Sequence, residues 1–241
     1  MAALRDQLLA AVNGIFGDYL VRTHNGLAID CGFFVDGKPL PAERSAWADA
    51  YPNPTGRVVV LVHGLMATER NWQRPVAATD ATNTAVVRED FGTRLAAEHG
   101  YTPLYVRYNT GQPIADSGAQ FASLLDDICA LYPVPITELL LVGHSMGGLV
   151  IRVYLRRYGA DKVLRVVTLG TPYGGSELAR IGFGVNGHQM VPGNDWLVRL
   201  AEEPLHVETT AIYSPHDNYV MPQANLLLPG AKGYALDGLG H

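Results

Sequence analysis

The chain has little cysteine and no cluster of basic residues: two of its 241 residues are cysteine, and its formal net charge is −5. Cys31 and Cys129 are far apart and match no metal-ligand spacing, so we expect free thiols and a reducing, cytoplasmic environment. The acidic balance argues against nucleic acid as a partner. No apolar run is long enough to span a bilayer, and Arg5 and Asp6 interrupt the apolar N-terminal pattern, unlike a signal peptide. These absences favour a water-soluble globular protein.

The length and an apolar content of 48% predict a single domain, residues 1–241, with a substantial core. Apolar strand-like runs alternate with amphipathic helical segments. The expected strands are 57–63, 102–108, 139–142, 162–169, 207–213 and 232–236, and the expected helices are 88–99, 115–131 and 146–158. The strands do not alternate between apolar and polar residues, which indicates a mostly parallel central sheet with helices on both faces.

Three regions lie outside this alternation. Residues 1–56 predict a helix over 3–16 that ends at Asn13-Gly14, strand-like pieces at 18–23 and 28–35, and a surface connection at 39–54. Residues 68–85 predict a polar loop. Residues 173–205 exceed a usual connection and contain Ile181, Phe183, Met190 and Trp196, which suggests a small cap or lid; an irregular crossover helix explains the length equally well.

The sequence Gly143-His-Ser-Met-Gly147 joins an apolar run to an amphipathic segment. A strand, sharp turn and helix in this order hold a serine hydroxyl above the carboxyl end of the sheet, and the flanking glycines leave room for the turn. Ser145 is therefore the candidate nucleophile. An ordinary glycine-rich turn is the alternative.

The apolar run that ends at His63-Gly64-Leu65 predicts a loop beside the candidate nucleophile. A strand that stops at His-Gly can turn its next backbone N–H towards a bound carbonyl oxygen. We expect the N–H groups of Leu65 and Met146 to form an oxyanion hole. The His63 side chain is expected to pack beneath the loop.

A serine needs a histidine as base and an acid to orient it. Asp217 follows a late strand and is the candidate acid, although aspartate is also common in turns, and Asp195 and Asp237 are poorer candidates. By elimination among eight histidines, His216 included, His241 is the candidate base. It is the last residue, so we expect the native chain to continue beyond it.

Several motifs together resemble the α/β-hydrolase superfamily, and within it bacterial esterase/lipase-like proteins related to the inositol deacylases of the PGAP1 type. The matching pieces are Val62-His-Gly-Leu65 with Asn71-Trp72, Arg107-Tyr-Asn-Thr-Gly111, Leu141-Val-Gly-His-Ser-Met-Gly-Gly148, Leu169-Gly-Thr-Pro-Tyr-Gly-Gly-Ser176, Ser214-Pro-His-Asp217 and Gly238-Leu-Gly-His241. They cover the chain from about Arg57 to its end. Many lipase-like relatives have histidine where this chain has Tyr173, which leaves the role of that position open. The resemblance implies a helix after the catalytic histidine in relatives.

These observations predict an α/β-hydrolase fold and a carboxylic ester hydrolase with a Ser145–Asp217–His241 triad that needs no metal or organic cofactor. The expected partner is a small-molecule ester or lipid with a short or medium apolar acyl group. Acyl transfer or thioester hydrolysis could use the same triad. A non-catalytic binding protein with this fold is the hypothesis from another class.

Overall fold

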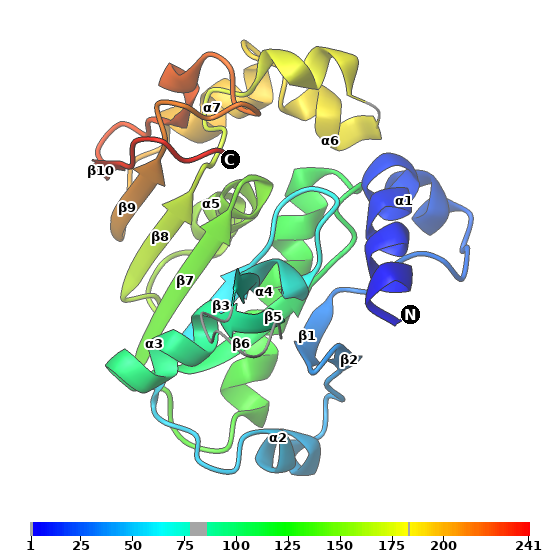
Figure 1. Cartoon of the computed structure of the whole chain (residues 1–241), viewed down its shortest axis with the longest axis vertical. Coiled ribbons are helices and arrows are strands. Elements are labelled where there is room, and N and C mark those ends of the chain that lie inside the picture. The colour runs from blue at the N-terminus through cyan, green and yellow to red at the C-terminus, as the bar shows by residue number, and fades with distance from the viewer. Residues whose placement is uncertain (1, 78–85, 183) are drawn as a thin grey trace.

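The computed structural model describes residues 2–77, 86–182 and 184–241. Within these residues one sheet has the strand order β10-β9-β8-β7-β3-β6-β1-β2 (Figure 1). The bounds are β1 Gly32–Val35, β2 Lys38–Pro39, β3 Arg57–Val62, β6 Thr102–Arg107, β7 Glu138–His144, β8 Arg165–Leu169, β9 Glu208–Tyr213 and β10 Lys232–Ala235. The strands from β10 to β6 are parallel, and β1 and β2 are antiparallel additions at one edge. The predicted mostly parallel sheet is confirmed.

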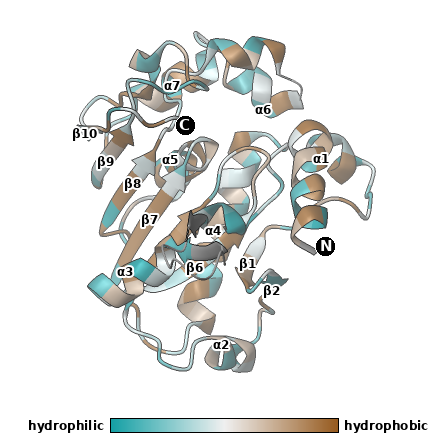
Figure 2. Ribbon diagram, viewed as in Figure 1, coloured by the Kyte–Doolittle hydropathy of each residue, from teal (hydrophilic) through white to brown (hydrophobic). Residues whose placement is uncertain are grey.

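Helices lie on both faces of this sheet, as β3 illustrates. Val58, Val60 and Val62 are fully buried in the larger core on the side of α4 (Ile114–Leu131) and α5 (Met146–Tyr158). Val59 and Leu61 are buried on the other side, in a much smaller cluster to which α3 (Phe91–His99) adds Leu95. Because both faces are covered in the centre, the strands are apolar at successive positions (Figure 2).

The N-terminal segment differs from its prediction. A single helix, α1 (Ala2–Arg22), continues through Asn13-Gly14 and includes the residues expected to form a strand at 18–23. The Asn13 amide group donates to the carbonyl of Leu27, and its oxygen accepts from the N–H of Ile29. Asn13 therefore ties the helix to the following loop, and tertiary contacts override its tendency to end a helix.

Other connections also contain regular structure. The predicted surface connection at 39–54 contains α2 (Arg44–Ala50), whose Trp47 is buried in the core. The predicted polar loop at 68–85 contains the 3₁₀ helix η1 (Glu69–Trp72) and strand β4 (Gln73–Ala77), which pairs with β5 (Val86–Asp90); its remainder, 78–85, lies outside the described residues. The helix expected from residue 88 begins at Phe91.

Residues 173–182 and 184–205 form several short helices, and within these described ranges there is no single crossover helix. They contain η2 (Glu177–Ile181), α6 (Gly184–Gln189) and α7 (Asp195–Glu202), and a further 3₁₀ helix, η3 (Gln223–Leu226), follows β9. Met190 and Leu197 are buried and join the main core, while Phe183 lies outside the described residues. The insertion therefore has its own apolar attachment to the body.

Two expectations from composition can be compared with the structure. Cys31 and Cys129 are free thiols. Among the described helices, none is both long enough and apolar enough to cross a membrane.

Candidate active site

The predicted turn at Ser145 joins β7 directly to α5. Ser145 has φ 53° and ψ −127°, a conformation that side-chain-bearing residues rarely adopt. Its N–H donates to the carbonyl of Leu169 at 2.8 Å, and its carbonyl accepts from the Thr171 hydroxyl at 3.0 Å. The neighbouring strand end thus fixes the serine in its strained conformation.

The flanking glycines of the turn are required by close backbone contacts. A Cβ at Gly147 would lie 2.3 Å from the carbonyl oxygen of Val62, and one at Gly143 would lie 2.7 Å from the backbone of Gly148. Because both obstacles are backbone atoms, no side-chain movement could relieve them. The Gly-x-Ser-x-Gly pattern here has a steric cause.

The loop after β3 lies against the candidate nucleophile. A Cβ at Gly64 would be 2.8 Å from Cβ of Ser145. Three backbone N–H groups lie near this contact, those of Leu65 and Met66 after Gly64 and that of Met146 after Ser145. The N–H of Met66 donates to the Thr110 hydroxyl at 3.1 Å. Those of Leu65 and Met146 donate to no acceptor in the part of the chain that the structure describes. Two N–H groups beside Ser145 are therefore available to a ligand.

His63 packs beneath this loop, as the sequence suggested. Its ring is fully buried, stacks on Tyr108 with centroids 4.7 Å apart, and its Nδ1 lies 2.9 Å from the carbonyl oxygen of Gly64. The Tyr108 hydroxyl donates to the carbonyl of His63 at 2.9 Å. His63 thus shapes the loop from below.

Asp217 and His241 are hydrogen-bonded, with Nδ1 of His241 2.8 Å from Oδ2 of Asp217. The other carboxylate oxygen accepts from the N–H groups of Tyr219 and Val220, both at 2.8 Å. Burial alone would raise the pKa of Asp217, but the hydrogen bonds from Val220, His241 and Tyr219 outweigh it and lower the pKa. The carboxylate therefore stays ionised and holds the imidazole in one orientation.

The rejected alternatives lie elsewhere. Asp195 begins α7 and Asp237 is exposed, and within the described chain neither carboxylate is hydrogen-bonded to a histidine. Nδ1 of His216 accepts the N–H of Gly238 at 3.1 Å, which fixes the loop that leads to His241. Tyr173, whose role was open, is buried and donates to the Thr168 hydroxyl.

The His241 ring has aromatic neighbours that the sequence analysis did not identify. It lies 5.0 Å from the His144 ring and 5.3 Å from the Tyr219 ring, measured between centroids. A Cβ at Gly170 would be 3.2 Å from the imidazole, so glycine leaves room for it.

Ser145 and His241 thus border the same turn, 169–171, but no direct hydrogen bond joins them in the described residues. The Gly-Thr-Pro motif after β8 was the available signal for this turn.

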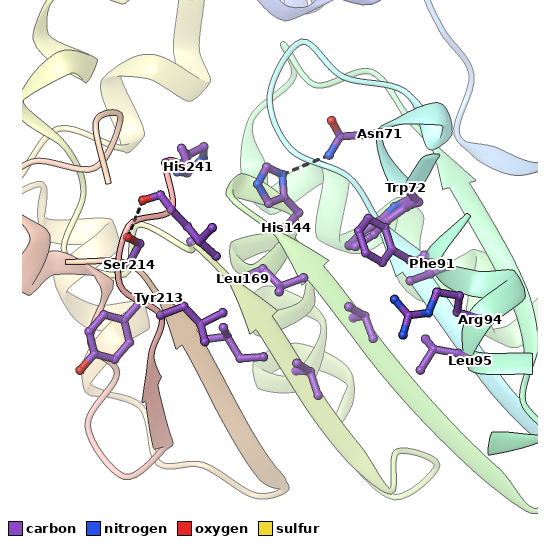
Figure 3. A pocket seen from close by; sticks show the side chains of 18 of the residues that line it. Asn71, Trp72, Phe91, Arg94, Leu95, His144, Leu169, Tyr213, Ser214 and His241 are labelled. Atoms are coloured by element: carbon purple, nitrogen blue, oxygen red, sulfur yellow. Dashed lines mark hydrogen bonds between the residues drawn. The ribbon is translucent and has the colours of Figure 1, made fainter. Parts of the chain in front are cut away.

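A cavity of about 780 Å³ extends from His144, Asp217 and His241 along the face of the sheet beside α3 (Figure 3). Its walls are mainly apolar side chains of β3, β7, β8 and β9, together with Trp72 and Phe91. Ser145 is not among the lining residues. The cavity therefore reaches the histidine–aspartate pair from the sheet side.

The buried imidazoles predict that stability decreases in mild acid. Burial lowers the pKa of both His63 and His144 to about 4. Between the ordinary histidine value of about 6.5 and pH 4, the unfolded chain binds protons that the folded chain does not, so the free energy of unfolding should fall over this window. Asp217, with its lowered pKa, affects stability only below about pH 4. Denaturant titrations at pH 7 and pH 5 measure the effect.

A matched pair of variants isolates the buried ring. We expect His63→Gln to reduce the loss of stability between pH 7 and pH 5, and the exposed His206→Gln to leave it unchanged. If the free energy of unfolding depended equally on pH in the wild type and in both variants, the effect could not be assigned to the buried neutral histidine.

Comparison with solved structures identifies the fold as that of the α/β-hydrolases. The mature form of the lipase BlEst2 from Bacillus licheniformis matches 86% of this chain and 88% of its own at 19% identity, with a TM-score of 0.60. The esterase RhEst1 from Rhodococcus sp. ECU1013 matches 78% of this chain and 85% of its own at 19% identity, with a TM-score of 0.50. Lipase B from Aspergillus fumigatus matches 75% of this chain and 45% of its own at 15% identity, with a TM-score of 0.59.

The sequence also places the chain in a family. The model of the PGAP1-like alpha/beta domain matches residues 53–206, well over half of the chain, so the protein belongs to that family. The resemblance inferred from the motifs is confirmed.

Proposed function

We propose that this protein is a serine hydrolase that cleaves carboxylic esters through an acyl-enzyme. The observation that carries the proposal is the 2.8 Å contact between Asp217 and His241, on the turn that also fixes Ser145. The esterase and lipase activities named for structures with the same fold agree with it.

In the proposed mechanism, Ser145 Oγ attacks the ester carbonyl while Nε2 of His241 takes its proton. Asp217 keeps the remaining proton on Nδ1 and stabilises the imidazolium. The N–H groups of Leu65 and Met146 stabilise the oxyanion. His241 then gives this proton to the departing alcohol. In the second half of the reaction, His241 takes a proton from water as the water attacks the acyl carbonyl, and returns it to Ser145 Oγ as the acid is released.

The preferred substrate is an ester with a short or medium apolar acyl group, because the insertion at 173–205 is small and partly apolar. Thioester hydrolysis or acyl transfer would use the same acyl-enzyme and differ only in the leaving group or acceptor. A non-catalytic binding role would require the serine to be unreactive.

Reaction with a fluorophosphonate tests the nucleophile directly. We expect covalent labelling of the peptide that contains Ser145, together with hydrolysis of p-nitrophenyl acetate and butyrate. Ser145→Ala should abolish both, while Ser123→Ala, an exposed serine on α4, should abolish neither. Absence of labelling in the folded wild-type protein would favour the binding-protein hypothesis.

A further inference from the structure

Helix α1 exposes most of its large apolar side chains. Its buried residues are Ala10, Asn13, Gly14 and Gly17 together with one large apolar residue, Leu20, and the small residues permit close contact with Met66 and Asn109. A surface helix ordinarily buries its bulky apolar face and exposes its polar one. In α1 the buried face is made mainly of small and polar residues.

The outward face of α1 carries an apolar stripe. Its members are Leu4, Leu8, Val12, Phe16 and Tyr19, which are exposed by 66, 61, 38, 56 and 57%. Their spacing of three and four residues puts them in one row about 22 Å long. Figure 1 shows α1 at the edge of the molecule, and Figure 2 shows its hydrophobic segments. Folding of the described chain leaves this row in water.

We propose that the stripe is the interface through which two copies of this chain associate, with their α1 helices antiparallel across a two-fold axis near Val12. That symmetry places Val12 against its own counterpart and Leu8 against Phe16 of the second copy. It also places Arg5 beside Tyr19 of the second copy, where a guanidinium and an aromatic ring attract each other. A single stripe therefore complements itself.

The area of the stripe suits a second copy of the chain, and the net charge disfavours an anionic lipid surface. Five side chains exposed to this extent, two of them aromatic, offer roughly 500 Å² per copy, and two copies together reach about 1,000 Å², the lower limit of specific interfaces. An anionic membrane is disfavoured by the net charge of −5. In addition, Arg22, near the stripe, is already paired with Asp18. An interface of this size is typical of weak or transient association.

Light scattering coupled to size exclusion, between 1 and 200 µM, tests the association. We expect the wild-type mass to rise from one chain to two across this range. Leu8→Glu/Phe16→Glu should remain a monomer at 200 µM, and Leu164→Glu, at a similarly exposed leucine just before β8, should still dimerise. Circular dichroism verifies that each variant is folded. This test does not depend on the proposed hydrolase activity.

A cysteine at the two-fold axis tests the arrangement. In a background without the exposed Cys129, Val12→Cys should oxidise to a disulfide-linked dimer, whereas Leu164→Cys should not. Three results would overturn the proposal: a monomer at all concentrations, a dimer that survives the double substitution, or a monomer that binds phosphatidylcholine vesicles through the stripe.

Discussion

Asp217→Asn should lower kcat for an aryl ester by about 10⁴-fold while changing KM little, because an asparagine cannot hold the proton of His241 on Nδ1. The amide oxygen should stay on the N–H groups of Tyr219 and Val220, so the amide NH2 faces the ring. Nδ1 then becomes the acceptor, and Nε2 carries the proton and cannot act as base. Steady-state kinetics at pH 8 measure the effect. Asp237→Asn, an exposed carboxylate in the same terminal loop, is the matched control.

The substitution should spare folding. The remaining carbonyl oxygen of asparagine can still accept the N–H groups of Tyr219 and Val220, which Oδ1 of Asp217 accepts now. His241→Ala should cause a comparable loss, and the double variant should be no worse than either single one, because the two residues act as a unit. Activity within tenfold of wild type in Asp217→Asn would show that the pair does not perform the proton transfer.

Arg107→Ala should destabilise the fold by about 3–5 kcal/mol, the largest stability effect that we expect, because it leaves the buried carboxylate of Glu69 without its two close hydrogen bonds and with only Arg70, 4.0 Å away, as a cationic neighbour. Nε and Nη2 of Arg107 lie 2.5 and 2.6 Å from the two oxygens of Glu69, and Nη2 lies 3.2 Å from Asp6 of α1. Both Arg107 and Glu69 are buried. Denaturant titration at pH 7 measures the free energy of unfolding.

Two further variants separate loss of the pair from loss of charge. Arg107→Met/Glu69→Met removes both charges and should recover a large part of the stability, since no uncompensated ion remains. Arg165→Ala breaks an exposed ion pair with Glu208 and should change stability little. If Arg107→Ala were as mild as Arg165→Ala, water would have to reach Glu69.

The centre of the fold was predictable because its strands carry the signal themselves. Val58 to Val62 are apolar at every position since both faces of β3 are covered, and the turn glycines are fixed by local backbone contacts. The N-terminal region was less predictable. Asn13 ends helices in isolation, yet here its side chain bonds a loop fourteen residues away, and Trp47 is buried by residues distant in sequence.

For the site, sequence order suggested which residues to consider but could not provide their neighbours. Asp217 could be selected because it follows a late strand, and the structure brings it to His241. The contact between the rings of His144 and His241 depends on how the C-terminal loop folds back over β8, and no motif records that path. The contact between Tyr219 and His241 could likewise not be predicted, because the turn at Asp217 brings the two rings together.

The position of His241 has a consequence for heat inactivation. It follows β10, an edge strand whose four residues are all exposed and which, among the described strands, pairs only with β9. Edge strands open at a lower free-energy cost than central ones. The histidine could therefore detach with β10 while the rest of the sheet stays intact. The upper working temperature would then be set by local opening of one strand, several degrees below global melting, and loss of activity at that stage would be reversible on cooling.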